Sequence, residues 1–167
     1  GLPENGWSTL SLQMPVLANG IGYEESAPLF RDVPGRINAG VEYLRTNGAK
    51  RIVIVAHSLG AAMGSYYLAN NSNESIKGFV GIGMSGSSSQ PDMDNIRSLT
   101  GISLPVLDLY GEQDLENVVA SAKSRQDSLL KTGNTLSQQK QVAGADHFFN
   151  GHNDELLREV LNWMGKL

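Results

Sequence analysis

The junction between an apolar run and a run of small residues constrains the fold more than any other part of the chain. Residues 51–55, Arg-Ile-Val-Ile-Val, are typical of a buried strand, and residues 61–64, Ala-Ala-Met-Gly, begin a helical pattern. Only five residues, Ala-His-Ser-Leu-Gly at positions 56–60, join the two. The chain must therefore turn sharply from a strand into a helix around Ser58.

A serine at such a turn is usually a nucleophile. Its side chain stands at the top of a sheet, and its backbone adopts a strained conformation. The turn requires small residues two positions before and after the serine, and Ala56 and Gly60 meet that requirement. The alternative is that Ser58 only caps the following helix, because serine is a preferred N-cap residue. A cap requires neither small neighbours nor a preceding buried strand, so the pattern favours a nucleophile.

The composition is that of an ordinary globular protein. Of the 167 residues, 40% are hydrophobic and 18% are charged, which suits a single domain over residues 1–167. The formal net charge is −4 and the basic residues are scattered singly, so we expect no nucleic-acid partner. The absence of cysteine excludes disulfides and thiol nucleophiles, and it leaves the compartment undetermined. No apolar run approaches the roughly 20 residues that a membrane-spanning helix needs.

Strand-like and helix-like patterns alternate along the chain. The runs that are typical of strands are 7–13, 51–56, 78–84, 105–110 and 138–142. The helical patterns are centred on 37–44, 59–70, 92–99, 116–131 and 157–164. Such alternation predicts an α/β fold in which a mostly parallel sheet of about five strands is flanked by helices.

A serine hydroxyl is a poor nucleophile unless an imidazole takes its proton and a carboxylate orients that imidazole. The chain has three histidines. His147 follows the last predicted strand, which favours it as the base, although a hydrogen-bonded loop histidine is the alternative. His152 is the reserve candidate. His57 adjoins Ser58, but its side chain should point away from that of the serine.

The orienting acid should lie after another strand, between the serine and the histidine in chain order. Asp114 stands in the turn after the fourth predicted strand, where its carboxylate can reach a loop histidine. Asp108 lies within that strand and is better explained as a buried, hydrogen-bonded structural residue. We therefore predict Ser58, Asp114 and His147 as the catalytic residues.

Ser58, Asp114 and His147, in this order, resemble the α/β-hydrolase superfamily. The likeness covers almost the whole chain, and its specific parts are residues 56–60, 110–114 (Tyr-Gly-Glu-Gln-Asp) and 144–149 (Gly-Ala-Asp-His-Phe-Phe). The resemblance implies a serine hydrolase that forms an acyl-enzyme on Ser58.

Residues 6–15 look like the fourth strand of that superfamily. Together with residues 36–60, they look most like a poorly characterised group of bacterial hydrolase-like proteins. If residues 7–13 are the fourth strand, the sequence lacks the first three strands, which makes it a minimal or truncated α/β-hydrolase fold. A further departure is Ala56, which replaces the first glycine of the usual G-x-S-x-G but is still small.

The lacking segment has two consequences. The loop after the third strand normally supplies one of two oxyanion-hole N–H groups, and Leu59 can supply only the other. Losing one donor typically costs about 2.7 to 4 kcal/mol of transition-state stabilisation. The third strand would also lie between the strands at 7–13 and 51–56, so either these two pair directly or an unsatisfied edge is exposed. We expect either a trimmed piece of a longer protein or a minimal version that pairs into a homodimer through that edge.

The predicted site is open, because about twenty residues between the strands at 78–84 and 105–110 are too few for a cap domain. Its walls are expected to include residues near the predicted strand ends: His57, Ser85, Phe148 and Phe149. An open site suits small or short-chain carboxylic esters or thioesters, by analogy with the fold. The histidines lack metal-ligand spacing and no glycine-rich phosphate loop occurs, so we expect no metal and no other cofactor.

Two alternatives to an esterase remain. The hydrolase scaffold can persist as a catalytically silent module for binding or assembly, in which the lacking amino-terminal segment prevents turnover. Acyl transfer to an acceptor other than water would use the same three residues, and only product analysis separates it from hydrolysis.

Overall fold

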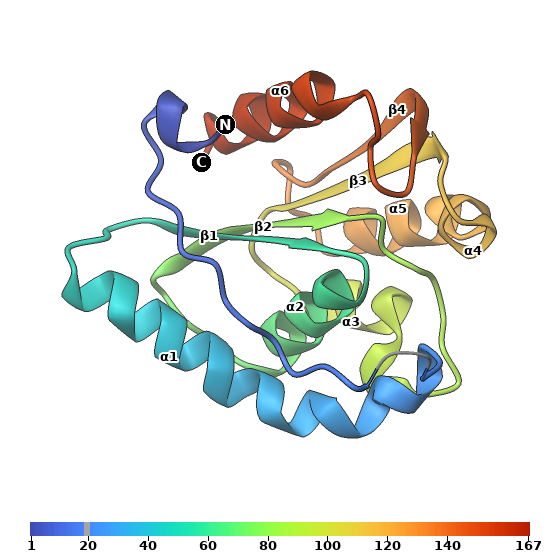
Figure 1. Ribbon diagram of the computed structural model, residues 1–167, viewed down its shortest axis with the longest axis horizontal. Helices are drawn as coiled ribbons and strands as arrows, with labels where there is room; N and C mark the ends of the chain where they lie inside the picture. Colours follow the sequence, from blue (N-terminus) through green and yellow to red (C-terminus); the bar gives the residue numbers. More distant parts are fainter. Residues whose placement is uncertain (19–20) are drawn as a thin grey trace.

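The computed structural model describes residues 1–18 and 21–167, and it shows an α/β fold built on a parallel sheet (Figure 1). The strands lie side by side in chain order: β1 (Ile52–His57), β2 (Ile76–Ile82), β3 (Val106–Gln113) and β4 (Gln138–Asp146). The predicted fold class is confirmed, but the sheet has four strands in the described residues instead of about five.

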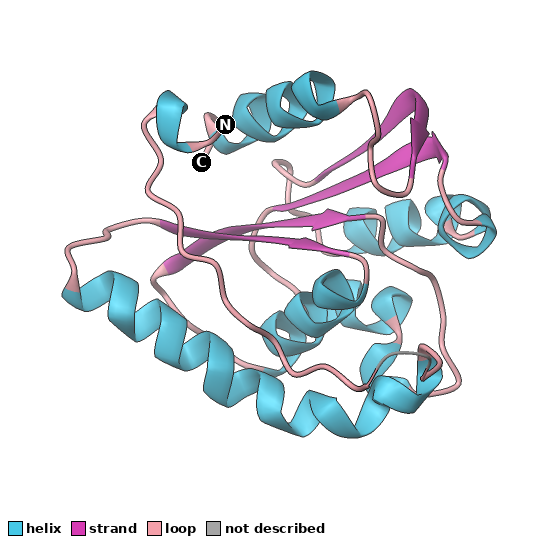
Figure 2. Ribbon diagram, viewed as in Figure 1, coloured by secondary structure: helices cyan, strands magenta, loops and turns pink. Residues whose placement is uncertain are grey.

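Helices alternate with these strands (Figure 2). They are α1 (Val33–Thr46), α2 (Leu59–Asn70), α3 (Asn95–Gly101), α4 (Glu116–Ala120), α5 (Ala122–Lys131) and α6 (Asn153–Met164). Short 3₁₀ segments lie at Pro3–Asn5, Glu24–Asp32 and Pro91–Met93. Within the described part of the chain, no helix has the length and apolar character required to cross a membrane.

The core forms two layers because successive side chains of a strand point to opposite faces of the sheet. Phe79 and Val106 pack on the face that α1, α2, α3 and α5 cover. Val80 and Leu107 pack on the other face, against Trp163 and its neighbours on α6. Strands β2 and β3 are buried along most of their length, as expected for central strands with helices on both sides.

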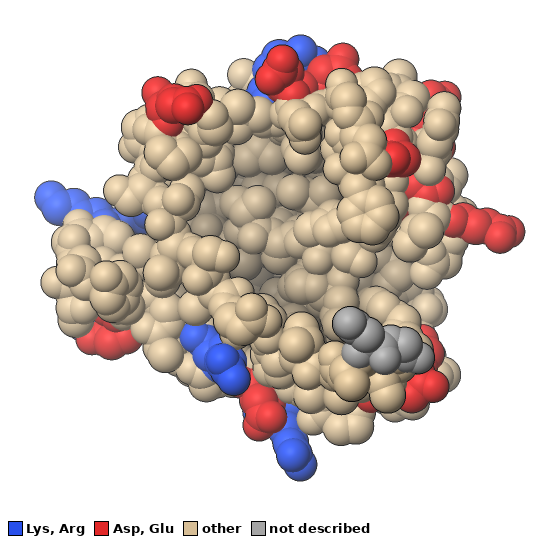
Figure 3. Space-filling view, viewed as in Figure 1, with Lys and Arg blue, Asp and Glu red and all other residues tan. Residues whose placement is uncertain are grey.

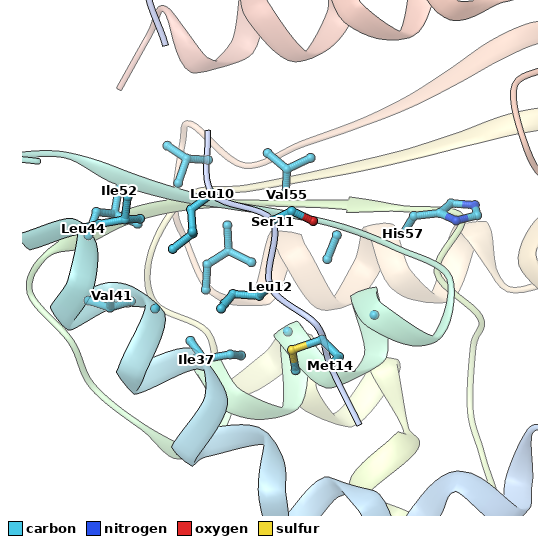
Figure 4. Close-up of a pocket in the computed structure, with 16 residues that line it drawn as sticks. Leu10, Ser11, Leu12, Met14, Ile37, Val41, Leu44, Ile52, Val55 and His57 are labelled. Atoms are coloured by element: carbon cyan, nitrogen blue, oxygen red, sulfur yellow. The ribbon is translucent and has the colours of Figure 1, made fainter. Parts of the chain in front are cut away.

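The prediction of a strand at Trp7–Gln13 is wrong. Residues 7–18 have no regular secondary structure, and they run past β1 without pairing with it. A cavity of about 330 Å³ lies between them, with Leu10, Leu12 and Met14 on one side and β1 on the other (Figure 4). An extended segment becomes a strand only when its backbone meets that of a neighbour. Here the cavity separates the segment from β1, so the two backbones do not meet.

The outer edge of β1 is therefore open, which decides between the two alternatives for the segment at 7–13. Among the described residues β1 pairs only with β2, and Val55 is 40% exposed although it belongs to an apolar run. Figure 3 shows the face of the molecule that is turned to the viewer in Figure 1. This face is hollowed near its middle, and the Lys, Arg, Asp and Glu side chains that are visible lie around the hollow. Pairing of this edge with a second copy stays a prediction.

Candidate active site

Ser58 lies in the turn between β1 and α2, with φ 54° and ψ −123°. A positive φ is strained for any residue other than glycine, and such strain is concentrated at functional sites. The Ser58 N–H donates to the Ile82 carbonyl at 2.9 Å, and the Ser58 carbonyl accepts from the Ala61 N–H at 2.9 Å. A Cβ built on Gly60 would lie 4.0 Å from the Ala56 Cβ, so these two small residues face each other across the turn.

Side chains from three strand ends meet beside this turn. His147 Nε2 lies 3.0 Å from Ser58 Oγ, and His147 Nδ1 lies 2.6 Å from Asp114 Oδ1. Ser58 follows β1, Asp114 follows β3 and His147 follows β4, so all three stand at the carboxyl ends of parallel strands. The structure thus brings together three residues that are far apart in the sequence and that the sequence singled out.

The hydrogen bonds around Asp114 indicate which nitrogen of His147 carries the proton. Asp114 Oδ2 accepts from the Gly111 N–H at 3.3 Å, and Oδ1 accepts from the Leu115 N–H at 2.8 Å. These contacts suit an ionised carboxylate, which can only accept. His147 Nδ1 therefore donates to Asp114, and Nε2 of the neutral ring can accept the Ser58 hydroxyl proton. Asp114 and His147 are both buried, so this pair is little screened by water.

Gly83, directly after β2, makes room for the imidazole. Its φ is +60°, and a Cβ at this position would lie 2.9 Å from His147 Cε1 and 3.0 Å from Nδ1. The ring therefore reaches Ser58 only because residue 83 has no side chain. Sequence reasoning missed this role, since Gly83 falls inside a predicted strand and gives no separate signal.

Two of the predicted wall residues border the relay. The His57 ring lies 4.6 Å from the His147 ring, and the Phe148 ring lies 5.2 Å from it on another side. Phe148 is 71% exposed, which leaves an aromatic face open to a bound molecule. His57 Nε2 lies 2.8 Å from the His147 carbonyl oxygen, so this side chain points to the backbone of the His147 loop.

The other two predicted wall residues, Phe149 and Ser85, make their contacts away from the relay. Phe149 is 1% exposed and packs in the core with α6, so its prediction as a substrate-binding residue is corrected. Its φ of 55° turns the side chain inward, directly after the exposed Phe148. Ser85 Oγ lies 3.2 Å from both the Tyr23 hydroxyl and the Asn95 amide nitrogen. Tyr23 is a neighbour that no sequence pattern indicated. Partial loss of hydration at its hydroxyl raises the pKa of Tyr23, although the residue is 36% exposed.

His152, the reserve candidate for the base, and Asp146, which precedes His147, both make local contacts that stabilise the structure. His152 Nδ1 lies 2.7 Å from Glu155 at the start of α6, a local contact within one helical turn. Asp146 accepts hydrogen bonds from the Asn150 N–H, the Asn150 side chain and the Phe148 N–H. These bonds, led by those from Asn150, lower the pKa of Asp146 from its ordinary value, and they shape the loop that carries His147.

The position of Leu59 suits an oxyanion donor. Leu59 is the first residue of α2, and the first N–H groups of a helix have no partner within it. The positive end of the helix dipole adds to their attraction for negative charge. In residues 1–18 and 21–167, no group of three or more His, Asp or Glu side chains could hold a metal ion.

The chain belongs to the family described as "Protein of unknown function (DUF3530)", whose model matches residues 24–166. No curated protein matches the sequence. Among solved structures, a protein described as a predicted CIB-like hydrolase from Thermoplasma acidophilum is similar with a TM-score of 0.63 and 19% identity. That likeness covers 83% of this chain and 60% of the other.

A protein of unknown function from Agrobacterium tumefaciens, described as a candidate α/β hydrolase, has a TM-score of 0.65 and 20% identity. The likeness covers 95% of this chain and 66% of that one. A candidate dienelactone hydrolase from Klebsiella pneumoniae has a TM-score of 0.63 and 19% identity, over 85% of this chain and 62% of its own. The fold is therefore that of the α/β hydrolases, and this chain spans 60 to 66% of the length of these three structures.

Proposed function

We propose that the protein is a serine hydrolase that cleaves small or short-chain carboxylic esters or thioesters through an acyl-enzyme on Ser58. The contacts of His147 carry this proposal. Its ring joins Ser58 Oγ at 3.0 Å to Asp114 at 2.6 Å, which is the geometry of a proton relay. The strained backbone of Ser58 supports the same role, because it holds the hydroxyl above the carboxyl edge of the sheet.

In the proposed reaction, Ser58 Oγ attacks the ester carbonyl carbon while His147 Nε2 takes the hydroxyl proton. The Leu59 N–H stabilises the negative charge that develops on the carbonyl oxygen. The imidazolium then gives its proton to the leaving alcohol or thiol as the bond to the acyl group breaks. A water molecule, deprotonated by the same ring, attacks the acyl carbon, releases the acid and restores the Ser58 hydroxyl.

The walls of the site support a small substrate. Between β2 and β3 the chain forms only a short 3₁₀ segment and α3, which add no cap over the site. Phe148 offers an exposed aromatic face next to His147. A short acyl or alkoxy group would be held at this open edge by apolar contact with that ring.

A fluorophosphonate probe tests the nucleophile directly, because it forms a covalent bond only with an activated serine. We expect the protein to be labelled, and mass spectrometry of its peptides should locate the adduct on Ser58. Ser58→Ala should abolish labelling. Ser124→Ala, which changes an exposed serine of α5, is the matched control and should be labelled like the parent.

The same experiment tests a second candidate function, a silent module that binds without turnover. The open edge of β1 favours this candidate, because no strand among the described residues pairs with β1 on the side away from β2. In α/β hydrolases the loop after the strand at that position normally supplies the second oxyanion donor. No labelling of the parent would support the silent module. Labelling without turnover of short esters or thioesters would mean that the nucleophile is active and the oxyanion site is incomplete.

Gly83→Ala tests the geometry of the relay. A methyl group there would lie 2.9 Å from the imidazole, so we expect the ring to move away from Ser58. A misplacement of about 1 Å costs roughly 100-fold, and we expect such a loss in kcat on a short-chain ester. Gly133→Ala is the control, because Gly133 also has a positive φ of +71°, but a Cβ added there would meet no heavy atom within 4 Å outside the adjoining residues. Equal losses in the two variants would argue against contact with His147.

A further inference from the structure

We propose that His57 is a positioning residue, which holds the general base in place through the backbone of His147. This inference rests on the proposed function and extends it to a residue outside the relay. His57 Nε2 lies 2.8 Å from the His147 carbonyl oxygen. A carbonyl oxygen can only accept, so His57 carries a proton on Nε2 and donates it to this bond.

The base needs such support because it reaches Ser58 from across the sheet. Strands β2 and β3 lie between β1, which precedes Ser58, and β4, which precedes His147. The contact with Asp114 ties the His147 ring to the end of β3. The bond from His57 ties the His147 main chain to the end of β1. One contact thus fixes the ring, and the other fixes the backbone that carries it.

The His147 loop also contains a strained residue. Phe149, two positions further on, has a φ of 55°, and backbone strain persists only where the surroundings hold it. Its side chain is anchored in the core, and Asp146 accepts hydrogen bonds from the Phe148 and Asn150 N–H groups. These contacts hold the loop on the side of β4. His57 holds it on the side of Ser58.

His57 is the last residue of β1 and directly precedes Ser58. The nucleophile and the anchor of the base are therefore adjacent at the end of β1, and a small shift of that strand end moves both together. Three roles for His57 give different expectations: donation to the His147 carbonyl, ring packing between His147 and Phe148, and direct contact with substrate. The ring centroids of His57 and Phe148 are 5.9 Å apart, so packing is a real alternative.

Two substitutions separate these roles. His57→Gln keeps an N–H donor at similar reach but removes the ring, whereas His57→Phe keeps a ring but removes the donor. If His57 positions the base, His57→Phe should lower kcat about 100-fold with a KM within about twofold of the parent. His57→Gln should restore kcat to within about fivefold. A loss in His57→Gln only, or a raised KM in both variants, would overturn the proposal.

A second readout does not depend on turnover. The proton on His147 Nδ1, in its short hydrogen bond to Asp114, should give a low-field proton NMR signal. We expect this signal to be sharp in the parent and in His57→Gln, and broadened by exchange with water in His57→Phe. If the parent cleaves no ester, the proposed function fails, but this signal still tests the role of His57. Identical spectra for the parent and His57→Phe would refute the positioning role. Should His57→Phe fail to fold, His57→Leu serves as the variant without a donor.

Discussion

Replacing Ser58 with alanine should lower kcat on a short-chain ester roughly a millionfold, and His147→Ala should lower it by a similar factor. The two side chains act as one unit. Without the hydroxyl, the imidazole has no proton to take, and without the imidazole, the hydroxyl is too weak a nucleophile. The double variant should therefore be about as slow as either single variant. If the two side chains acted independently, the two losses in kcat would multiply instead.

The rates can be measured by release of a chromophoric alcohol, at enzyme concentrations high enough to follow the slow variants. Asp114→Asn provides a graded comparison. It should lower kcat by about 10⁴-fold, because the asparagine amide favours the wrong tautomer of His147 while leaving the ring in place. Multiplicative losses in the double variant would show that Ser58 and His147 do not work together, and the proposed relay would be rejected.

Arg125→Met should lower the free energy of unfolding by about 3 to 5 kcal/mol. The side chains of Arg125 and Asp108 are 0% exposed, and Arg125 Nε donates to Asp108 Oδ2 at 2.8 Å. Burial raises the pKa of Asp108, and the nearby guanidinium opposes that change. The substitution leaves this carboxyl buried without its cation. It also removes the bonds from Arg125 Nη1 to the Val118 carbonyl and to Ser121 Oγ.

Urea unfolding measures this effect, and the same helix offers a matched control. Lys123 pairs with Asp127 on the exposed side of α5, so Lys123→Met should change stability by less than about 1 kcal/mol. The combination Asp108→Leu with Arg125→Met should recover most of the loss, because no buried charge then remains. Asp108 Oδ1 and Arg125 Nη2 have no hydrogen-bond partner among the described residues, so the parent pair is itself incompletely satisfied. A loss in Arg125→Met no larger than that of the control would contradict this account.

Local patterns predicted the elements that depend on neighbours in the sequence. The helix expected at residues 59–70 is α2, with the same bounds, and the strand expected at 51–56 is β1, shifted by one residue. Asp114 and His147 could be selected because a strand end is visible in the sequence and the chain order limits the choice. Their distances could not be predicted, because they depend on how three strands align side by side.

The failures share a physical cause, which is dependence on groups far away in the sequence. Residues 7–13 have a strand-like pattern, but a strand also requires a hydrogen-bonded neighbour, and the structure has a cavity there. The helix expected at 116–131 is interrupted at Ser121, whose hydroxyl bonds to the Asn117 carbonyl and accepts from the buried Arg125. Phe148 and Phe149 look alike in the sequence, and only the positive φ of Phe149 separates a surface ring from a core ring.

The side of β1 that faces away from β2, where no strand of the described residues pairs with it, has a mechanical consequence. The backbone that ends in His57 and Ser58 is held by the β2 ladder on one side and borders an apolar cavity on the other. Any polypeptide that adds a ladder to the unpaired side would stiffen the segment that aims the nucleophile. Pairing at that edge would therefore change how firmly the Ser58 hydroxyl oxygen is held in its alignment, without any contact with the hydroxyl itself.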